Sequence, residues 1–376
     1  MEKRGWLEAI FTTYPRIKLR NENGVPASKI HCDWLLETAM LAANRYGLQP
    51  NRWKALDTFK VRHHDSWLSR HTPECDVFVA LSGSGPVVGP LVQSRGGAWI
   101  CDRGSTHIVW QARELAAEYA RWGVEFPLIH QIHIDRECEE YHHADRLVVP
   151  SNFTKRSYVE MGVPQEKLSV IPYGANLSRF SPHGAPPEDE FVILVVGQFG
   201  LRKGAPYLLE AFKRFRHPRK RLKVIGSVTS EMRGIMSRFA LDRVEFVGTV
   251  ANEGLARHYS SAHVLILPSV EDGFGMVMGE ALACGCPVIA TENTVAENLF
   301  SNGREGFVIK VRDIDAIVDR LDILASDKEL RQRMSAAAVE RVRSVGGWDE
   351  YGELYANVVD LIAAKNTPSS DPKTTS

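Results

Sequence analysis

The sequence predicts an α/β protein made of two parallel α/β domains. Short apolar runs alternate with amphipathic segments, which is the pattern of parallel sheets covered by helices. The alternation stops at a Pro-rich polar stretch near residues 175–190 and then starts again. At 376 residues the chain is also too long for one ordinary domain. Hydrophobic residues make up 44% of the chain and charged residues 24%, so ample cores can form.

The first half of the chain alternates strands and helices. The runs CDVFVAL and GGAWICD are short and apolar, as buried parallel strands are. Further along, Asn152 is expected to cap a helix that Gly162 and Pro164 end, and Gly123 is expected to stop an earlier helix. The expected strands are 75–81, 96–102, 144–151 and 167–174, and the expected helices are 105–123 and 152–163.

The second half repeats this pattern. The run FVILVVG at 191–197 is continuously apolar, which indicates a strand buried on both faces. Further strands are expected at 221–226, 243–250 and 262–269, and a helix at 205–215. The expected organisation is a first domain at 1–175, a linker at 176–190, a second domain at 191–346, a final helix at 347–365 and a disordered polar tail at 366–376.

The opening residues do not fit the start of a doubly wound domain. Residues 2–4 are expected to form the last turn of a helix that Gly5 stops, and a strand is expected to follow. A doubly wound domain normally begins on its first strand, whose C-terminal loop faces the ligand cleft. Two interpretations stay open: the first strand and helix are missing, or the chain carries an unusual N-terminal arm.

The balance of charges limits the classes of partner. Lys plus Arg and Asp plus Glu both number 46, which argues against a large basic field for nucleic acid. The basic run at 212–223 fits a membrane surface or an anion, and equally a solvated helix end. Six cysteines without a framework are expected to be reduced, which favours the cytoplasm. The sequence opens without a signal-peptide pattern, and no apolar run approaches the roughly 20 residues that span a bilayer.

One segment, EDGFGMVMGEALACGCPVIAT at 271–291, points to a ligand. Strands are expected on both sides of it, so a helix should connect them and stop at Gly285. Gly273, Phe274 and Gly275 would then lie at the helix N-terminus, on the carboxyl edge of the sheet. Unpaired N–H groups and a partial positive charge at such a terminus attract phosphate, and glycine lets a ligand approach the backbone.

Charged side chains on two loops suit a nucleotide-sugar. Glu280, about one and a half turns into that helix, can direct its carboxylate at a polyol such as a ribose. Asp272 lies one side chain from whatever the phosphate carries. Arg202 and Lys203, in QFGLRKG after the strand at 191–197, would stabilise the charge that grows on a diphosphate leaving group. Because cations can replace magnesium in this role, we expect no metal and no cofactor.

Three separated segments together resemble family 4 of the retaining GT-B glycosyltransferases. They are PSVEDGFGMVMGEALACGCPVIAT, GQFGLRKG and VPSNFTKRSYVEMGVPQEKLSVIPYGANLSRFSP, and the resemblance covers roughly residues 75–365. It implies two Rossmann-like domains facing each other across a cleft, with the donor held mainly by the second. It also implies that residues 351–365 form the family's final helix, which crosses back to the first domain.

The resemblance carries roles over by position. Arg202 and Lys203 match the pair that holds the donor diphosphate, and Glu280 matches the acidic residue on the ribose hydroxyls. Asp272 falls where the E-x7-E motif usually has its first Glu, near the donor sugar, and its shorter side chain leaves open whether Glu271 makes this contact instead. The remaining substrate-binding positions are the backbone of Gly273, Phe274, Gly275 and Met276, together with Gly197 and, near the base, Gly248.

In the first domain, the resemblance points to CDRGSTHI at 101–108 as the loop beside the acceptor and the transferred sugar. His107 is the first candidate catalytic residue there, followed by Arg103 and Asp102, and the alternative is that His107 merely begins a helix. The SGSG loop at 82–85 also offers backbone N–H groups, although a G-x-G pattern alone has little specificity.

Two other classes of site are weighed against this interpretation. The segment HQIHIDRECEEYHH at 130–143 contains many residues of the types that bind metal ions, but we favour a polar helix near the cleft or the surface there. The histidines and cysteine concerned are His130, His133, Cys138, His142 and His143. A dinucleotide oxidoreductase needs G-x-G-x-x-G after its first strand, and GSGPVVG misses that spacing.

The sequence therefore predicts a retaining glycosyltransferase of the hexosyltransferase type. Its donor would be a UDP- or GDP-sugar, and its acceptor a hydroxyl of a sugar, a lipid-linked or a small molecule in polysaccharide, lipopolysaccharide or glycolipid synthesis. The expected place is the cytoplasm, with peripheral contact at the inner membrane face and without nucleic acid. The alternative is a truncated, non-catalytic protein that binds nucleotide-sugars.

Overall fold

The computed structural model describes residues 1–20, 24–46, 53–127, 129–176 and 178–366. Its internal contacts divide the chain into two compact units, each described by itself below. The first unit comprises Met1–Arg103, Ile129–Val148 and Tyr355–Ser376, and the second comprises Gly104–Leu128 and Val149–Leu354. The chain therefore passes between the units more than once, and the domain limits expected from the sequence stay a prediction.

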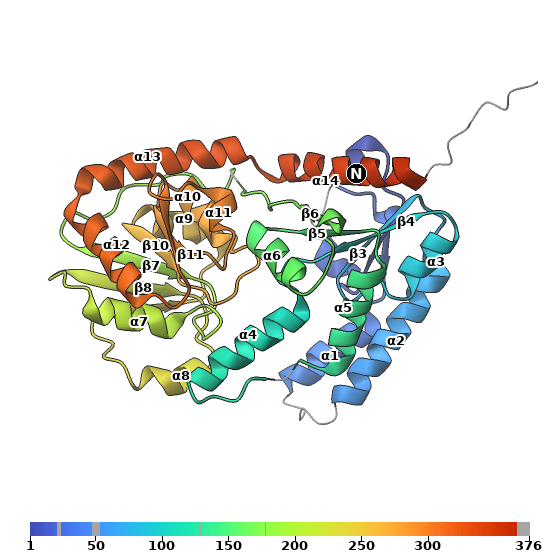
Figure 1. Ribbon diagram of the computed structural model, residues 1–376, viewed down its shortest axis with the longest axis horizontal. Helices are drawn as coiled ribbons and strands as arrows, with labels where there is room; N and C mark the ends of the chain where they lie inside the picture. The colour runs from blue at the N-terminus through green and yellow to red at the C-terminus, as the bar shows by residue number, and fades with distance from the viewer. Residues whose placement is uncertain (21–23, 47–52, 128, 177, 367–376) are drawn as a thin grey trace, which may run out of the picture. The chain divides into compact units, whose positions relative to one another are not determined.

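A six-stranded parallel sheet forms the centre of the second unit. Its strands are β7 (Phe191–Val196), β8 (Lys220–Ile225), β9 (Val244–Gly248), β10 (Val264–Leu267), β11 (Val288–Thr291) and β12 (Gly306–Ile309). Strands β7, β8, β10 and β11 are labelled in Figure 1. They lie in the order β12-β11-β10-β7-β8-β9. The chain order therefore reverses between β7 and β10, and parallel sheets of this kind bind ligands at the carboxyl edge of such a switch point.

Both faces of this sheet are buried, as the continuous apolar run at 191–197 predicts. Val192, Leu194 and Val196 of β7 face one core, and the residues between them face the other. Helices α9 (Asn252–Ser260), α10 (Val277–Ala283) and α11 (Ala296–Leu299) cover the first face. Helices α7 (Ala205–Arg214), α8 (Ser230–Met236) and α12 (Ile314–Ser326) cover the second. Figure 1 shows the two layers on either side of the strands.

Helix α4 (Ile108–Arg121) also belongs to the second unit. Its Glu118 is completely buried and accepts hydrogen bonds from the Tyr207 hydroxyl and from Arg312 Nε, both at 2.7 Å. A buried carboxylate needs such partners, because removing it from water is costly. The helix ends before Gly123, whose φ of 71° confirms the predicted stop.

Helix α6 (Asn152–Glu160) corrects the expected cap. The N-cap is Ser151, since its backbone is extended and its Oγ accepts a hydrogen bond from the Thr154 N–H at 3.1 Å. Asn152 is instead the first helical residue, and the Asn side chain cannot cap from inside the helix. The 3-10 helix η5 (Gln165–Lys167) and strand β6 (Leu168–Val170) follow.

The first unit is built on β3 (Val77–Leu81), β4 (Ala98–Asp102) and β5 (Arg146–Val149), which pair in parallel in that order. Its helices are α1 (Leu35–Arg45), α2 (Trp53–His71), α3 (Val88–Ser94) and α5 (Gln131–His143). At the N-terminus, the 3-10 helix η1 (Glu2–Arg4) ends at Gly5, whose φ of 71° matches the predicted stop.

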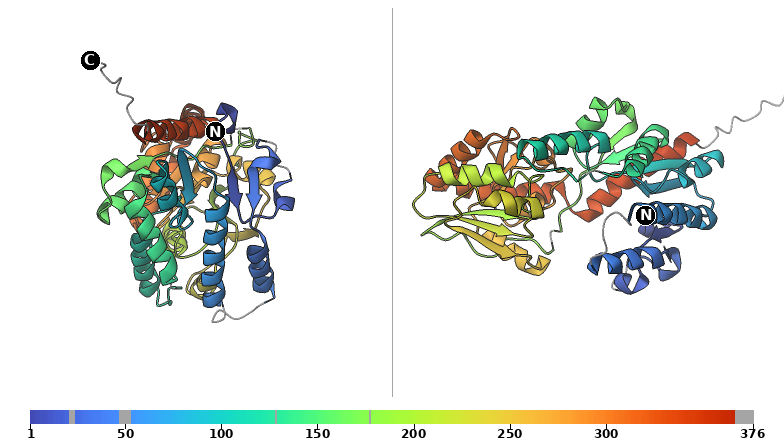
Figure 2. Two further views of the ribbon diagram at one scale, coloured as in Figure 1. Left: turned by 90° about the vertical axis from the view of Figure 1, so that its right-hand side faces the viewer. Right: turned by 90° about the horizontal axis from the view of Figure 1, so that it is seen from below.

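A separate two-stranded parallel sheet pairs β1 (Ile10–Thr12) with β2 (Ile30–Cys32), next to the 3-10 helices η2 (Arg16–Leu19) and η3 (Ala27–Lys29). These are the darkest blue segments of Figure 2. Phe11 of β1 packs edge-on against Trp67 of α2, with ring centroids 5.6 Å apart. The strand expected after Gly5 is therefore present.

Two helices close the described chain, α13 (Lys328–Val345) and α14 (Trp348–Asn366). The division between the units falls inside α14, at Tyr355. The expected disordered tail lies, from residue 367, outside the described residues. Among the helices of the described segments, none is long and apolar enough to cross a membrane.

Candidate functional site

The two loops at the switch point carry four of the charged residues singled out from the sequence. Arg202 and Lys203 lie on the loop after β7, and Glu271 and Asp272 lie on the loop after β10. The loops are directly bonded, because the Arg202 carbonyl accepts the Val270 N–H at 2.9 Å. The topology therefore brings these four side chains to the edge where a ligand of such a sheet binds.

Glu271 is the most completely bonded of the four. It is fully buried, and Arg202 Nε donates to its carboxylate at 2.7 Å. Ser105 and Thr106 donate to Oε1 at 3.0 and 2.8 Å, and Gln111 donates to Oε2 at 3.0 Å. Burial alone would raise the pKa of Glu271, but the Arg202 charge and the hydrogen bonds outweigh it and hold the pKa below its ordinary value.

Asp272 pairs with the other cation. Its carboxylate forms an ion pair with the Lys203 ammonium, and its own N–H donates to the Asn293 carbonyl at 3.1 Å. Only 6% of the residue is exposed. Each of the two cations thus has one of the two neighbouring carboxylates as a partner.

The glycine loop between Asp272 and α10 corrects the expected helix boundary. Helix α10 begins at Val277 with Met276 as its N-cap, so Gly273, Phe274 and Gly275 precede the helix. Gly275 has a φ of 69°, which lies outside helical geometry. At the other end, Gly285 has a φ of 73° and donates to the Leu282 carbonyl at 3.0 Å, which confirms the predicted stop.

Gly273 is required by a close approach within the second unit. A Cβ at this position would lie 2.3 Å from the Gly104 carbonyl oxygen. The Gly273 carbonyl also accepts hydrogen bonds from the Ser151 and Thr154 hydroxyls at 2.8 and 3.1 Å. Any larger side chain would push the loop away from the segment that carries Ser105.

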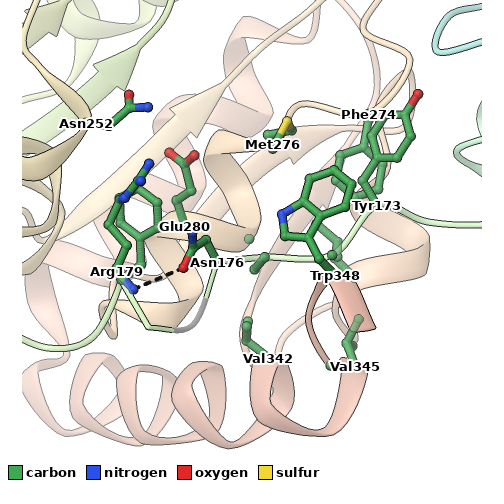
Figure 3. A pocket seen from close by; sticks show the side chains of 16 residues that line it. Tyr173, Asn176, Arg179, Asn252, Phe274, Met276, Glu280, Val342, Val345 and Trp348 are labelled. Carbon is green, nitrogen blue, oxygen red and sulfur yellow. Dashed lines mark hydrogen bonds between the residues drawn. The ribbon is translucent and has the colours of Figure 1, made fainter. Parts of the chain in front are cut away.

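Glu280 of α10 lines a cavity of about 130 Å³, shown in Figure 3. Its carboxylate lies at the polar end of the cavity, on the side where the Arg179 and Asn252 side chains are drawn. The Tyr259 hydroxyl donates to Glu280 Oε2 at 2.7 Å. Burial raises the pKa of Glu280, while Tyr259 and Arg179 act in the opposite direction.

The other end of the cavity is aromatic. Tyr173 stacks on Trp348 with ring centroids 6.0 Å apart and contacts Phe274 at 5.0 Å. Figure 3 shows these three rings together, with Met276 between them and Glu280. The cavity therefore combines Phe274, Met276 and Glu280 from the predicted set, whereas Arg202 and Lys203 are not among its lining residues.

Two further predicted positions lie at strand ends of the same sheet edge. Gly197 follows β7 with a φ of 120°, and Gly248 ends β9 with a φ of 81°. Between them Gly226 follows β8, where a Cβ would lie 2.0 Å from the Gly197 carbonyl oxygen. The sequence analysis missed Gly226, although RLKVIG shows a glycine directly after a strand.

The candidate residues at 102–107 are divided between the units. His107 belongs to the second unit and is the N-cap of α4, where its Nδ1 accepts the Val109 N–H at 3.3 Å. It is buried, and its ring packs edge-on against Tyr158. A role of His107 at the reacting atoms stays a prediction.

Asp102 and Arg103 belong to the first unit. Burial raises the pKa of Asp102 to about 6, and a hydrogen bond from Tyr355 opposes that rise. Arg103 donates to the Glu137 carboxylate at 2.6 Å. Asp102 therefore keeps a perturbed carboxyl group at the carboxyl end of β4, which is the property expected of a functional group there.

The SGSG loop of the first unit is filled by the chain itself. The N–H groups of Gly83 and Gly85 both donate to the Glu140 carboxylate. Gly85 and Gly89 also lie against the fully buried Trp99, where a Cβ would meet the indole ring at 2.7 and 2.1 Å. The glycine spacing in GSGPVVG is thus explained by packing.

The His-rich segment 130–143 forms α5, and its acidic residues Glu137 and Glu140 are buried. No group of three or more His, Cys, Asp or Glu side chains in the described part of the chain is arranged to hold a metal ion.

Several residues of the second-unit site carry no local sequence signal. Ser105, Thr106 and Gln111 bond to Glu271 from 160 to 166 positions away. Arg179 and Asn252 face the cavity from a loop and from the start of α9. Only the folded sheet brings these positions together, so spacing along the chain does not reveal them.

The part of the chain that holds these loops and α10 is similar to known glycosyltransferases. Residues 179–341, which hold the switch-point loops and α10, match the family model for glycosyl transferases group 1. D-inositol 3-phosphate glycosyltransferases of Streptomyces scabiei and Kribbella flavida are each 28% identical to the chain. The matches cover 68% and 55% of this chain and 65% and 54% of those proteins, so the chain spans between half and two thirds of their length.

Solved structures show the same fold. Sucrose-phosphate synthase from Thermosynechococcus elongatus has a TM-score of 0.69 and 23% identity, covering 85% of this chain and 81% of that one. Anabaena HepE in complex with UDP-glucose has a TM-score of 0.62 and 16% identity, covering 80% and 82%. These neighbours are GT-B proteins, so the α/β architecture expected from the sequence is confirmed as the GT-B fold.

Proposed function

We propose that the chain, whose residues 179–341 match the family model for glycosyl transferases group 1, moves a sugar from a nucleotide-diphosphate sugar to an acceptor hydroxyl. The donor is a UDP- or GDP-sugar, and the sugar keeps its anomeric configuration. One observation carries the proposal. The loops after β7 and β10 bring two cations into ion pairs with two carboxylates, and the loop after β10 leads into the cavity that Glu280 lines. HepE, a structural neighbour, has been solved with UDP and UDP-glucose, which supports a nucleotide-sugar donor.

The ribose of the donor binds at the polar end of the cavity. The Glu280 carboxylate accepts hydrogen bonds from vicinal ribose hydroxyls, and Asn252 and Arg179 lie on the same side of the cavity. The raised pKa of Glu280 fits a carboxylate that waits partly desolvated for a hydroxyl partner. Nucleotide release should therefore depend on Glu280 in its charged form.

The donor diphosphate binds between Arg202 and Lys203. An ammonium has three N–H donors and a guanidinium has five, so each cation can hold its carboxylate and a phosphate oxygen together. As the bond to the sugar breaks, negative charge grows on the leaving oxygen, and fixed cations stabilise that charge. A phosphate oxygen of the donor takes the acceptor proton, and closure around the donor excludes water.

Because these cations supply the positive charge, we propose that the reaction needs no metal ion. EDTA treatment should leave the rate of nucleotide release within about twofold of the untreated rate. A loss of activity that added Mg²⁺ or Mn²⁺ restores would contradict this part of the proposal.

The acceptor class is a sugar, a lipid-linked sugar or a small molecule in polysaccharide, lipopolysaccharide or glycolipid synthesis. The D-inositol 3-phosphate glycosyltransferases among the relatives support a hydroxylated acceptor. The second candidate function is a non-catalytic protein that binds a nucleotide-sugar. Nucleotide release separates the two, since a pure binder is stabilised by nucleotide but releases no nucleoside diphosphate.

The decisive assay incubates the protein with a panel of UDP- and GDP-sugars and measures free nucleoside diphosphate. We expect release from at least one donor, and a loss of at least about 100-fold in Glu280→Ala and in Arg202→Ala/Lys203→Ala. Arg333→Ala, a change of an exposed residue on α13, is the matched control and should behave as wild type. Wild-type turnover in the site variants would refute the assignment.

We also propose a cytoplasmic location with peripheral contact at an anionic membrane. All six cysteines, each within the described residues, are free thiols, which suits a reducing compartment. On the first unit, Tyr14 and Ile17 are 58% and 70% exposed beside the cations Arg16, Lys18 and Arg20. Exposed apolar groups among cations favour an anionic bilayer surface.

Co-sedimentation with vesicles tests this contact. Phosphatidylglycerol vesicles should retain the protein, neutral phosphatidylcholine vesicles should not, and Ile17→Asp/Lys18→Glu should abolish retention. The matched control reverses charge in the basic run of the second unit, Lys213→Glu/Arg216→Glu. Loss of retention in the control alone would move the contact to residues 212–223.

A further inference from the structure

We infer that Glu271 is a positioning residue of the donor site. Its carboxylate holds three segments of the second unit in one arrangement: residues 105–111, the loop after β7 and the loop after β10. Asp272, and not Glu271, then makes the contact to the donor sugar. The inference rests on the proposed function, and its test is designed to be read even if that function fails.

The acceptor capacity of Glu271 is filled. A carboxylate offers about four lone-pair sites, and four donors lie within 3.0 Å of its two oxygens. The residue is also fully buried. A sugar hydroxyl could reach Glu271 only by displacing Ser105, Thr106, Gln111 or Arg202. Asp272, which has a single ion pair to the terminal group of Lys203, is the carboxylate better placed to accept a new hydroxyl.

The segment that Glu271 holds lies directly against the donor loop, which is the loop between β10 and α10, residues 268–276. Ser105 and Thr106 adjoin Gly104, whose carbonyl oxygen would be 2.3 Å from a Cβ on Gly273. Ser105 also accepts a hydrogen bond from Gln111 at 2.9 Å, so both ends of the segment are joined. If Glu271 no longer holds this segment, the donor loop loses the surface that it packs on.

Glu271 also fixes the orientation of Arg202. The hydrogen bond is made by Nε, and because the guanidinium is planar, a bond at Nε sets the direction of the whole group. The Arg202 side chain is 39% exposed, so it extends from a buried anchor towards the solvent-accessible edge. The inference therefore assigns to Glu271 an effect on catalysis that passes through Arg202 and the 105–111 segment.

The chain provides a matched control in Glu118. This glutamate is equally buried, belongs to the same unit and is paired with Arg312 Nε at the same distance of 2.7 Å. Its partners Tyr207 and Arg312 lie on α7 and after β12, away from the loop after β10. Either change removes a buried carboxylate from a partly exposed arginine, so both changes should cost stability.

The experiment compares Glu271→Gln with Glu118→Gln in the full chain. Both variants should melt at lower temperature than wild type. Below these melting temperatures, only Glu271→Gln should lower kcat for nucleotide release, by about 10- to 100-fold, with a smaller change in KM for the donor. Equal losses of kcat in both variants, or wild-type kcat in Glu271→Gln, would overturn the inference.

Amide hydrogen exchange reads the positioning without any activity. In Glu271→Gln, exchange should accelerate in residues 104–111 and 270–276, whereas Glu118→Gln should accelerate exchange in residues 114–121 and in α7 only. Unchanged exchange in 104–111 would refute the positioning role, whether or not the wild type releases nucleotide. If Glu271→Gln does not fold, Gln111→Ala removes one donor, keeps the charge pair and should lower kcat by about threefold to tenfold.

Discussion

A buried glutamate lies at the carboxyl edge of each sheet, and the pKa values of the two glutamates are shifted in opposite directions. In the first unit Glu140 accepts the N–H groups of Gly83 and Gly85, and its neighbour Glu137 carries a like charge. Burial raises the pKa of Glu140 to about 7, although the two N–H donors act in the opposite direction. In the second unit Glu271 has the Arg202 guanidinium and three further donors, and its pKa lies below the ordinary value.

This difference teaches where a ligand anion can bind. In the first unit the glycine-loop donors already hold a carboxylate from the same chain, so the loop is complete. In the second unit the carboxylates pair with cations that have further donor capacity, and the donor loop leads into a cavity. A glycine-rich loop after a strand is therefore a weaker sign of a phosphate site than the charges that surround it.

The largest effect should come from the cation at the second edge. Lys203→Ala removes a fixed charge at the proposed diphosphate site, so nucleotide release should fall by about 100- to 1,000-fold. Lys213→Ala, on the exposed face of α7, should leave the rate unchanged. Steady-state kinetics with the best donor of the panel make this measurement. A loss below about threefold in Lys203→Ala would place the diphosphate elsewhere.

The pH dependence of stability should separate the two glutamates. The rise of the Glu140 pKa from 4.5 to about 7 is worth about 3 kcal/mol. Because the folded state binds this proton more tightly, the contribution is fully present below pH 4.5 and is lost as pH rises through about 7. In Glu140→Gln the amide cannot titrate, so the free energy of unfolding should fall less between pH 5 and pH 8 than in wild type, as denaturant titrations can show. Parallel curves would contradict the raised pKa.

Two glycine substitutions should separate an effect on stability from an effect on donor binding. Gly89→Ala places a Cβ 2.1 Å from the Trp99 ring, and the overpacking should cost about 1 to 3 kcal/mol of stability. Gly273→Ala, in the second unit, should instead reduce donor binding, because the added Cβ pushes the donor loop away from Gly104. Melting curves together with KM for the donor distinguish the two outcomes. A Gly273→Ala protein with wild-type KM would show that the close approach has no bearing on the donor.

The smallest effect should come from the partner of Glu280. Tyr259→Phe removes a hydrogen bond of about 1 kcal/mol. Since that bond lowers the pKa of Glu280, its loss should raise this pKa and move the acid limb of the kcat/KM profile to higher pH. A profile that does not move would mean that Glu280 does not titrate in the assay range.

Local patterns predicted much of the fold, because the forces that set it are local. The continuous apolar run predicts β7, and Gly123 and Gly285 mark the helix ends where the chain needs a positive φ. The expected cap of α6 lies one residue too late, since Ser151 and Asn152 are both good capping types and only geometry decides between them.

The site was predictable only where chemistry and sheet topology coincide. Charges placed after strands single out Arg202, Lys203 and Asp272, and Glu280 is singled out within the following helix α10; the roles of these four residues stay predictions. The bonds of Glu271 to Ser105, Thr106 and Gln111 join positions more than 150 residues apart, and no periodicity encodes them. Likewise, nothing in SGSG reveals that Glu140 fills the loop.

Thermal melting with UDP and GDP tests most directly whether the second unit grips a nucleotide diphosphate. At 100 times its dissociation constant, one nucleotide should stabilise the wild type by about 2.7 kcal/mol and raise its melting temperature. Lys203→Ala and Glu280→Ala should each lose this shift, while Glu118→Gln should keep it despite a lower starting temperature. A wild type that neither nucleotide stabilises, or a Lys203→Ala/Glu280→Ala double variant that shifts as far as the wild type, would contradict the account.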